Sequence, residues 1–227
     1  MSRPNPPAPV SPYLVPGFYD TALAKGRHRD IVGGRWDETG RVQMAILRDA
    51  GLQPHHRLLD IGAGSMRLGC KAVPFLNPGH YWATDASLAL MQRGRALELP
   101  DPAALPEDHL IEDADFALPG VPPEIDFAIA FGVFTHLPAP MLRQALVQMS
   151  PRLPRLQALL ITVFLAPEGH SGPWRQADGV VTHPDRAPWH LSQTDVLSIA
   201  TDSGWSLSRK PALLPRGQAL FCGRQQR

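Results

Sequence analysis

The sequence predicts an α/β protein in which helices cover both faces of a mostly parallel sheet. From residue 57 onward, apolar runs typical of strands alternate with stretches of helical periodicity, and this alternation requires a parallel sheet. One run, residues 157–165, is apolar almost throughout, as expected for a central strand buried on both faces. A glycine-containing turn follows the first predicted strand, at the edge where open α/β sheets bind their ligands.

The expected elements follow this alternation along the chain. A short helix at residues 17–26 and a stronger amphipathic helix at residues 36–50 precede the sheet. Strands are expected at residues 57–61, 80–84, 109–111, 125–131, 157–165, 205–209 and 219–223, and helices at residues 65–73, 88–97, 141–149 and 193–203. Residues 166–188 contain prolines and little periodicity, so we expect an active-site loop or lid there.

Length and composition fit one domain with a leading arm. The chain has 227 residues, of which 44% are hydrophobic and 19% are charged, so one sizeable core can form. Prolines in the first sixteen residues remove backbone donors and oppose a regular helix or strand. We therefore expect residues 1–34 to form a proline-rich arm and a short helix that can act as a lid. Residues 35–227 are expected to form the ligand-binding domain.

Charge, cysteine usage and hydropathy exclude several classes of function. The formal net charge is +1 and the basic residues are scattered, so no nucleic-acid partner is expected. Cys70 and Cys222 belong to no metal or redox spacing, and the histidines lack the spacing of a metal triad, so no metal is expected. The sequence has no apolar run that could span a bilayer and no signal peptide, which predicts a cytoplasmic location without membrane contact.

The most informative motif is the segment Leu-Leu-Asp-Ile-Gly-Ala-Gly-Ser at residues 58–65. Gly62 and Gly64 let the backbone turn sharply and approach a ligand closely, and a following helix start offers amide donors. Asp85 ends the next predicted strand, where a carboxylate can accept hydrogen bonds from both ribose hydroxyls. A turn without a ligand and a helix-capping Asp85 are the alternatives. The two features together favour a bound nucleoside.

These residues resemble motifs I and II of the class I S-adenosylmethionine-dependent methyltransferases, and the resemblance extends over roughly residues 35–224. It implies a Rossmann-like, doubly wound, three-layer sheet of seven strands with an antiparallel last strand. In that family, the counterpart of Asp60 and the turn lie against the methionine part of the cofactor, and the counterpart of Asp85 holds the ribose. The residues that the resemblance assigns to these contacts are Asp60, Gly62, Ala63, Gly64, Asp85 and Ala86.

A third motif resembles the adenine-binding segment of the same family. The resemblance implies that Asp113 or Asp115 receives the adenine amino group and that Phe116 flanks the ring. Met66 replaces the frequent third glycine of the family, and Arg67 follows it, which disfavours a nicotinamide cofactor more than S-adenosylmethionine. Arg67 or Arg35 is the candidate partner of the cofactor carboxylate, because a guanidinium fork suits that group. For Arg35, simple solvation at the surface is the alternative.

The segment Val-Phe-Thr-His-Leu at residues 133–137 resembles a stretch found after the fourth strand of many small-molecule methyltransferases. It follows Phe131 and Gly132, which the resemblance places beside the cofactor. The Asn/Asp-Pro-Pro-Tyr signature of enzymes that methylate nucleic-acid amino groups is missing here. His136 is a candidate general base, because an ordinary histidine pKa near 6.5 suits proton removal at neutral pH. A structural histidine packed beside the cofactor is the alternative.

Two further places are candidates for contact with the acceptor. Trp189 and His190 precede a predicted helix that Ser192 can cap, and they would suit a pocket wall and a second catalytic base. Tyr19, with Tyr13, belongs to the arm and can close over the site as a substrate contact.

The predicted function is methyl transfer from S-adenosyl-L-methionine to a small molecule, with S-adenosyl-L-homocysteine as product, and a role in secondary metabolism is one expectation. One alternative is cyclisation of S-adenosylmethionine itself, which releases methylthioadenosine. The others are a nicotinamide-dependent dehydrogenase and a non-catalytic cofactor-binding module. The sequence specifies neither the acceptor nor the oligomeric state.

Overall fold

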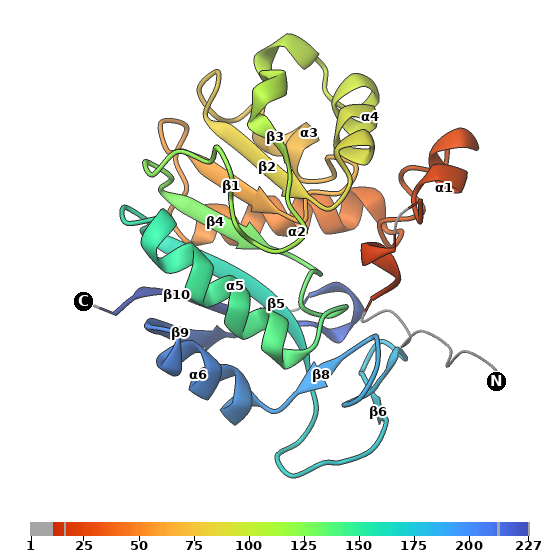
Figure 1. The fold of residues 1–227 in the computed structure, drawn as a ribbon, viewed down its shortest axis with the longest axis vertical. Coiled ribbons are helices and arrows are strands. Elements are labelled where there is room, and N and C mark those ends of the chain that lie inside the picture. The colour runs from red at the N-terminus through yellow and green to blue at the C-terminus, as the bar shows by residue number, and fades with distance from the viewer. Residues whose placement is uncertain (1–10, 16, 213, 227) are drawn as a thin grey trace, which may run out of the picture.

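The computed structural model describes residues 11–15, 17–212 and 214–226, and its centre is one twisted sheet (Figure 1). Seven strands lie side by side in the order β3-β2-β1-β4-β5-β10-β9. Their bounds are β1 Leu58–Ile61, β2 Tyr81–Asp85, β3 Leu110–Glu112, β4 Phe127–Ala130, β5 Ala158–Leu165, β9 Trp205–Lys210 and β10 Ala219–Gln225. An eighth strand, β8 (His190–Leu191), pairs with the carboxyl end of β5. All predicted strands are therefore present, with shifts of one or two residues at their ends.

The direction of β10 sets this sheet apart from an all-parallel one. β10 runs antiparallel to both of its neighbours, with Phe221 opposite Ile161 of β5 and Arg209 of β9. The pairs β1–β2, β1–β4, β2–β3 and β4–β5 are all parallel. This arrangement confirms the predicted mostly parallel sheet with an antiparallel last strand.

Helices cover both faces of the sheet and complete three layers. Alternate strand residues point to opposite faces, so Leu59 packs in the cluster with α5 and α6, whereas Leu58 packs with α2, α3 and α4. Figure 1 shows α5 and α6 in front of the sheet and α2 behind it. The bounds are α1 Asp20–Ala24, α2 Trp36–Asp49, α3 Gly69–Ala72, α4 Leu88–Glu98, α5 Ala139–Arg152 and α6 Gln193–Asp202.

Helix caps explain where two of these helices begin. Ser192 and Asp195 form a capping box at α6, which confirms the capping role expected of Ser192. At α4, the Oγ of Ser87 accepts a hydrogen bond from the amide of Leu90 at 3.2 Å. Ser87, not Asp85, is therefore the N-cap of α4.

The predicted helix at residues 65–73 is mostly wrong. Met66 has a φ of 67° and Gly64 a φ of 57°, and a right-handed helix cannot pass through residues in the left-handed region. Turns continue to residue 68, and only the four residues of α3 are helical. The glycine turn therefore leads into a second tight bend instead of a helix start.

The expected loop at residues 166–188 contains a small hairpin. β6 (Trp174–Arg175) pairs antiparallel with β7 (Val181–Thr182), and Gln176 Nε2 donates to the Oγ1 of Thr182 at 3.0 Å. Four 3₁₀ turns complete the fold: η1 Pro12–Leu14, η2 Pro102–Ala104, η3 Glu107–His109 and η4 Pro215–Gly217. η1 lies within the arm, where the prolines led us to expect no helical structure, because proline is tolerated in a first helical turn.

The part of the arm that the structure describes packs onto the sheet domain. The main-chain carbonyl of His28 accepts a hydrogen bond from the Oγ of Ser65 at 2.9 Å. The Nε2 atom of the His28 ring lies 2.6 Å from Oε1 of Glu98. Residues 1–10, which hold most of the arm's prolines, lie outside the described part of the chain. None of the described helices is long and apolar enough to cross a membrane.

Candidate functional site

A cavity of about 440 Å³ lies at the carboxyl ends of the central strands. Residues directly after β1, β2, β3 and β4 line it, and the N-terminal segment and the link before β10 form its other walls. The order of the strands along the chain reverses between β1 and β4, and open α/β sheets bind ligands at such a switch point. The fold thus places residues of all the predicted motifs around one cavity.

The glycine turn after β1 is packed too closely for any side chain. Gly62 has a φ of 70°, and a Cβ there would lie 2.4 Å from Cγ2 of Val133. A Cβ on Gly64 would lie 2.8 Å from Cγ1 of Val32. The amides of Gly62 and Ala63 donate to the carbonyl of Thr84 at 2.7 and 3.0 Å, which ties the turn to the end of β2. The turn therefore offers close backbone approach, while these two amides are already used.

Asp85 lines the cavity beside this turn. Its Oδ2 accepts a hydrogen bond from the amide of Gly64 at 2.9 Å, and its Oδ1 accepts one from Ser87 at 3.0 Å. Burial raises the pKa of Asp85 to about 6, and the backbone hydrogen bonds oppose that shift. Each carboxylate oxygen can accept more than one hydrogen bond, so Asp85 can also receive hydroxyl donors from a ligand.

Asp60 lies behind the turn and does not line the cavity. The hydroxyl of Tyr81 donates to its Oδ2 at 2.6 Å. Burial raises the pKa of Asp60 to about 7, while the bond from Tyr81 and the charge of Arg67 lower it. This position indicates that Asp60 stabilises the strand before the turn, whereas the resemblance implied a contact with the ligand.

The two candidate arginines are placed differently. Arg67 lines the cavity, and its Nη1 donates to the carbonyls of Val32 and Gly34 at 2.9 and 3.2 Å. Its Nε is buried without a hydrogen-bond partner among the described residues, and burial lowers its pKa to about 10. Arg35 does not line the cavity and pairs with Asp178 at 3.2 Å. The surface alternative is the one the structure shows for Arg35.

Only part of the third motif reaches the cavity. Asp113 lines the cavity, and its carboxylate accepts hydrogen bonds from the amides of Ala117 and Leu118 at 3.1 and 2.9 Å. Asp115 lies outside the cavity wall. Phe116 lines the cavity, with its ring 5.7 Å from that of Phe134. Asp113 is thus the carboxylate that faces the site.

The residues after β4 form the middle of the cavity wall. Phe131, Gly132 and His136 line it, and the amide of Gly132 donates to Oγ1 of Thr162 at 2.8 Å. The ring of His136 lies 4.7 Å from the ring of Tyr13 in an edge-on arrangement. Burial lowers the pKa of His136 to about 4, and the charge of Arg216 adds to the shift. His136 is therefore neutral at pH 7.

Trp189 and His190 are not brought to the cavity, although Pro188 beside them is. The amide of Trp189 donates to the carbonyl of Thr135 at 2.8 Å, and Nδ1 of His190 lies 2.8 Å from Oγ1 of Thr182. Their placement fastens the hairpin segment to β5 and the loop after β4. The expectations of a substrate-contacting Trp189 and a catalytic His190 do not agree with this position.

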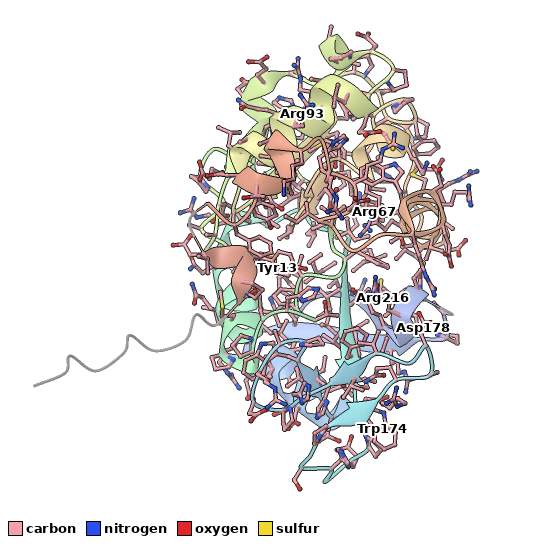
Figure 2. The ribbon with its side chains drawn as sticks, turned by 90° about the vertical axis from the view of Figure 1, so that its right-hand side faces the viewer. Tyr13, Arg67, Arg93, Trp174, Asp178 and Arg216 are labelled. Carbon is pink, nitrogen blue, oxygen red and sulfur yellow. The ribbon has the colours of Figure 1, made fainter. Side chains whose placement is uncertain are left out.

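Other cavity residues had not been singled out from the sequence. Gln43 lies on α2, and its Oε1 is buried without a partner among the described residues. Arg216, in η4, lines the cavity from the side of β10. Tyr13 and Tyr19, which the sequence did indicate, line it from the arm. Figure 2 shows Tyr13, Arg67 and Arg216 around the middle of the molecule. An amide on a helix and an arginine in a proline-flanked link carry no local sequence signal of such a role.

Comparison with known proteins gives matches at the level of structure. No protein-family model matches this sequence, and no curated protein sequence matches it. A magnesium protoporphyrin IX methyltransferase from Synechocystis PCC 6803, solved with bound S-adenosylmethionine, has a TM-score of 0.62 at 16% identity. That match covers 97% of this chain and 100% of the other.

Two further structures match over similar lengths. A 1,6-didemethyltoxoflavin-N1-methyltransferase from Burkholderia thailandensis, with bound S-adenosylhomocysteine, has a TM-score of 0.63 at 13% identity and covers 98% of this chain and 93% of its own. A sugar N-methyltransferase from Streptoalloteichus sp ATCC 53650 has a TM-score of 0.61 at 16% identity, with 92% and 93% covered. The chain therefore has the fold of these methyltransferases along nearly its whole length.

Proposed function

We propose that this chain is an enzyme that transfers a methyl group from S-adenosylmethionine to a small molecule. The observation that carries the proposal is that Asp85 and the turn at Gly62 and Gly64 face one cavity at the switch point of the sheet. The shared fold supports it, because two of the matched structures contain bound S-adenosylmethionine or S-adenosylhomocysteine. A cytoplasmic location and a role in secondary metabolism stay predictions from the sequence.

The residues present fit this cofactor at the end that would hold its amino acid part. Arg67 offers a buried Nε donor and Gln43 a buried Oε1 acceptor, each without a partner among the described residues. A buried polar group without a partner is costly, so both are expected to be satisfied by a ligand. A carboxylate suits the guanidinium and an ammonium suits the amide oxygen. This pair therefore matches the two charged groups of a methionine moiety.

The other end of the cavity fits an adenosine. The carboxylate of Asp85 can accept hydrogen bonds from ribose hydroxyls, and Asp113 can accept one from the adenine amino group. Phe116 presents an apolar wall beside Asp113. The site residues proposed for the cofactor are Gly62, Ala63, Gly64, Arg67, Asp85, Ala86, Asp113, Phe116, Phe131 and Gly132, all of which line the cavity.

Bound S-adenosylmethionine supplies an electrophilic methyl group on a sulfonium centre. The chain's own contribution is to hold the acceptor in line and to exclude water, and good orientation alone can contribute about 7–11 kcal/mol. Tyr13, Tyr19 and the loop after β4 enclose the space where the acceptor would lie. His136 is neutral at pH 7, but a pKa of about 4 makes its imidazole a weak base, so its position favours the structural alternative beside the cofactor over general-base catalysis.

The strand order disfavours the nicotinamide alternative. Dinucleotide-binding sheets have the order 3-2-1-4-5-6 with parallel strands, whereas here the antiparallel β10 is inserted between β5 and β9. Calorimetric titration with S-adenosylhomocysteine and, separately, with NAD tests this point. Binding of the first and not of the second is the expected result; the reverse would overturn the proposal.

The reaction itself is tested by incubating the protein with S-adenosylmethionine and a panel of small acceptors. Chromatography with mass spectrometry then identifies the nucleoside product. Methyl transfer gives S-adenosylhomocysteine only when an acceptor is present. Methylthioadenosine released without an acceptor would support cyclisation, and binding without any turnover would support a non-catalytic module.

A further inference from the structure

The guanidiniums that line the cavity have no carboxylate partner among the described residues. The three lining carboxylates all have donors: Asp30 pairs with Arg27 at 2.8 Å, and Asp85 and Asp113 accept main-chain amides. The two lining guanidiniums, Arg67 and Arg216, bond only to main-chain carbonyls. Neither forms an ion pair with any carboxylate of the described residues. Both guanidiniums in the cavity lining therefore lack a carboxylate within ion-pair distance among the described residues.

The two guanidiniums come from segments beside different strands, and both bond to the segment 32–34 at the edge of the cavity. Arg67 follows the turn after β1, where the proposed cofactor contacts lie. Arg216 precedes β10, next to Gln218, whose side chain accepts a hydrogen bond from Thr162 of β5 at 2.6 Å. β1, β4 and β5 separate β2 from β10, which places the two strands about 19 Å apart at ordinary strand spacing. The backbone of Arg216 therefore lies on the side of the cavity opposite β2, and its side chain reaches Gly33, between the two carbonyls that Arg67 binds.

Arg216 lines the cavity and has an unusual backbone conformation. Its φ is 64°, a left-handed value that residues other than glycine rarely adopt, and such residues cluster at functional sites. Its Nη2 donates to the carbonyl of Gly33 at 2.6 Å, across the mouth of the site. Burial raises the pKa of Tyr13 and lowers that of His136; the charge of Arg216 opposes the first shift and adds to the second. All three residues line the same cavity.

Apolar residues form much of the cavity that Arg216 lines. They include Val133, Phe164, Pro188, Pro215 and the ring of Tyr13, and Pro215 directly precedes Arg216. A ligand that fits beside Arg216 needs an apolar body as well as a group that binds a guanidinium. The planar fork of arginine is matched by a carboxylate or a phosphate.

We propose that the acceptor is a small organic anion with an apolar body, whose oxyanion is bound by Arg216 beside Tyr13 and His136. This inference rests on the proposed function, because methyl transfer requires an acceptor in the half of the cavity that the cofactor leaves open. It assigns to Arg216 the acceptor and to Arg67 the cofactor.

The test uses three probes that share a phenyl ring: benzoate, phenyl phosphate and neutral benzamide. Each is titrated by ligand-observed NMR into the full chain saturated with S-adenosylhomocysteine. At least one of the anions is expected to bind at least tenfold more tightly than benzamide. In Arg216→Gln, this preference is expected to disappear. Arg175→Gln is the matched control, because Arg175 is also exposed and bonds a carbonyl, that of Gly179, outside the cavity lining.

The outcomes separate this inference from the proposed function. If benzamide binds as tightly as both anions, if neither anion saturates, or if the preference survives in Arg216→Gln, the inference is overturned. Calorimetry with S-adenosylhomocysteine on the same samples tests the proposed function by itself. If it does not bind the unmodified protein, the proposed function fails, and the anion titrations without it still decide the role of Arg216.

Discussion

The carboxylate of Asp85 accepts a hydrogen bond from the amide of Gly64, with 2.9 Å between Oδ2 and N. This bond joins the end of β2 to the turn after β1, two places 21 residues apart in the sequence. It fixes the direction of the carboxylate before any ligand arrives. Preorganised polar groups of this kind lower the cost of binding.

Replacing Asp85 with alanine should weaken S-adenosylhomocysteine binding more than tenfold, because the ribose would lose its acceptor. Calorimetry measures this directly. Asp101→Ala is the matched control, since Asp101 also accepts a main-chain amide, that of Ala103, outside the cavity lining. Equal affinity of Asp85→Ala and the unmodified protein would contradict the ribose assignment.

The two arginines first considered for the cofactor carboxylate should separate in a binding experiment. Arg67→Gln should weaken S-adenosylhomocysteine binding about tenfold or more, because a charge-assisted hydrogen bond is lost. Arg35→Gln should change it less than twofold, because Arg35 pairs with Asp178 outside the cavity. A larger effect at Arg35 than at Arg67 would show that the wrong arginine has been assigned.

Gly62→Ala should destabilise the fold as well as the site. The left-handed φ of 70° costs about 1–2 kcal/mol for an alanine, and the new Cβ would lie 2.4 Å from Val133. Thermal unfolding should therefore show a lower Tm. The double variant Gly62→Ala/Val133→Ala should recover part of the loss caused by the steric clash. If Gly62→Ala lowers the Tm as much in the Val133→Ala background as in the unmodified protein, the clash does not contribute.

The buried pair of Tyr81 and Asp60 should matter for stability. Tyr81→Phe leaves Oδ2 of Asp60 without its donor, which should lower the free energy of unfolding by about 1–3 kcal/mol. Urea unfolding near pH 7 measures the change. Tyr13→Phe is a useful comparison, because it removes a tyrosine hydroxyl at the cavity rather than beneath the turn. A cost no larger than that of Tyr13→Phe would contradict this supporting role.

The pKa of His136 predicts a pH dependence of stability. The folded state holds this pKa at about 4, below the ordinary value of 6.5, so the unfolded chain binds a proton more readily between these values. Stability from this group is therefore lost as the pH falls from 6.5 towards 4. Between pH 7 and pH 5 the loss should be about 2 kcal/mol.

Urea unfolding of the unmodified protein and of His136→Asn at pH 7 and pH 5 isolates this contribution. The variant should lose about 2 kcal/mol less over the same interval. An identical loss in both proteins would mean that His136 titrates near its ordinary pKa.

Local signals in the sequence predicted much of the sheet and most of the residues proposed to contact the cofactor. The glycine turn and Asp85 were predictable because each directly follows an apolar strand, and parallel strands bring their carboxyl ends together. The interruption at Met66 was not, because methionine is an ordinary helix former and nothing local indicates its φ of 67°. Helical propensity was overridden there by the packing of the second bend.

Long-range contacts account for the rest. The motif predicts a ligand contact for Asp60, but in the fold its carboxylate accepts a hydrogen bond from Tyr81 of the neighbouring strand. Arg216 reaches the cavity only because β10 is inserted between β5 and β9, which carries the link before β10 to the carboxyl ends of the parallel strands. A pattern confined to neighbouring residues contains neither relationship.

A crystal structure of the protein with S-adenosylhomocysteine tests the central claim most directly. The account predicts the ligand in this cavity, with its ribose hydroxyls hydrogen-bonded to Asp85 and its carboxylate on Arg67. Saturated crystals in which the cavity between the glycine turn and Asp85 stays empty, or in which the ligand lies elsewhere, would contradict it.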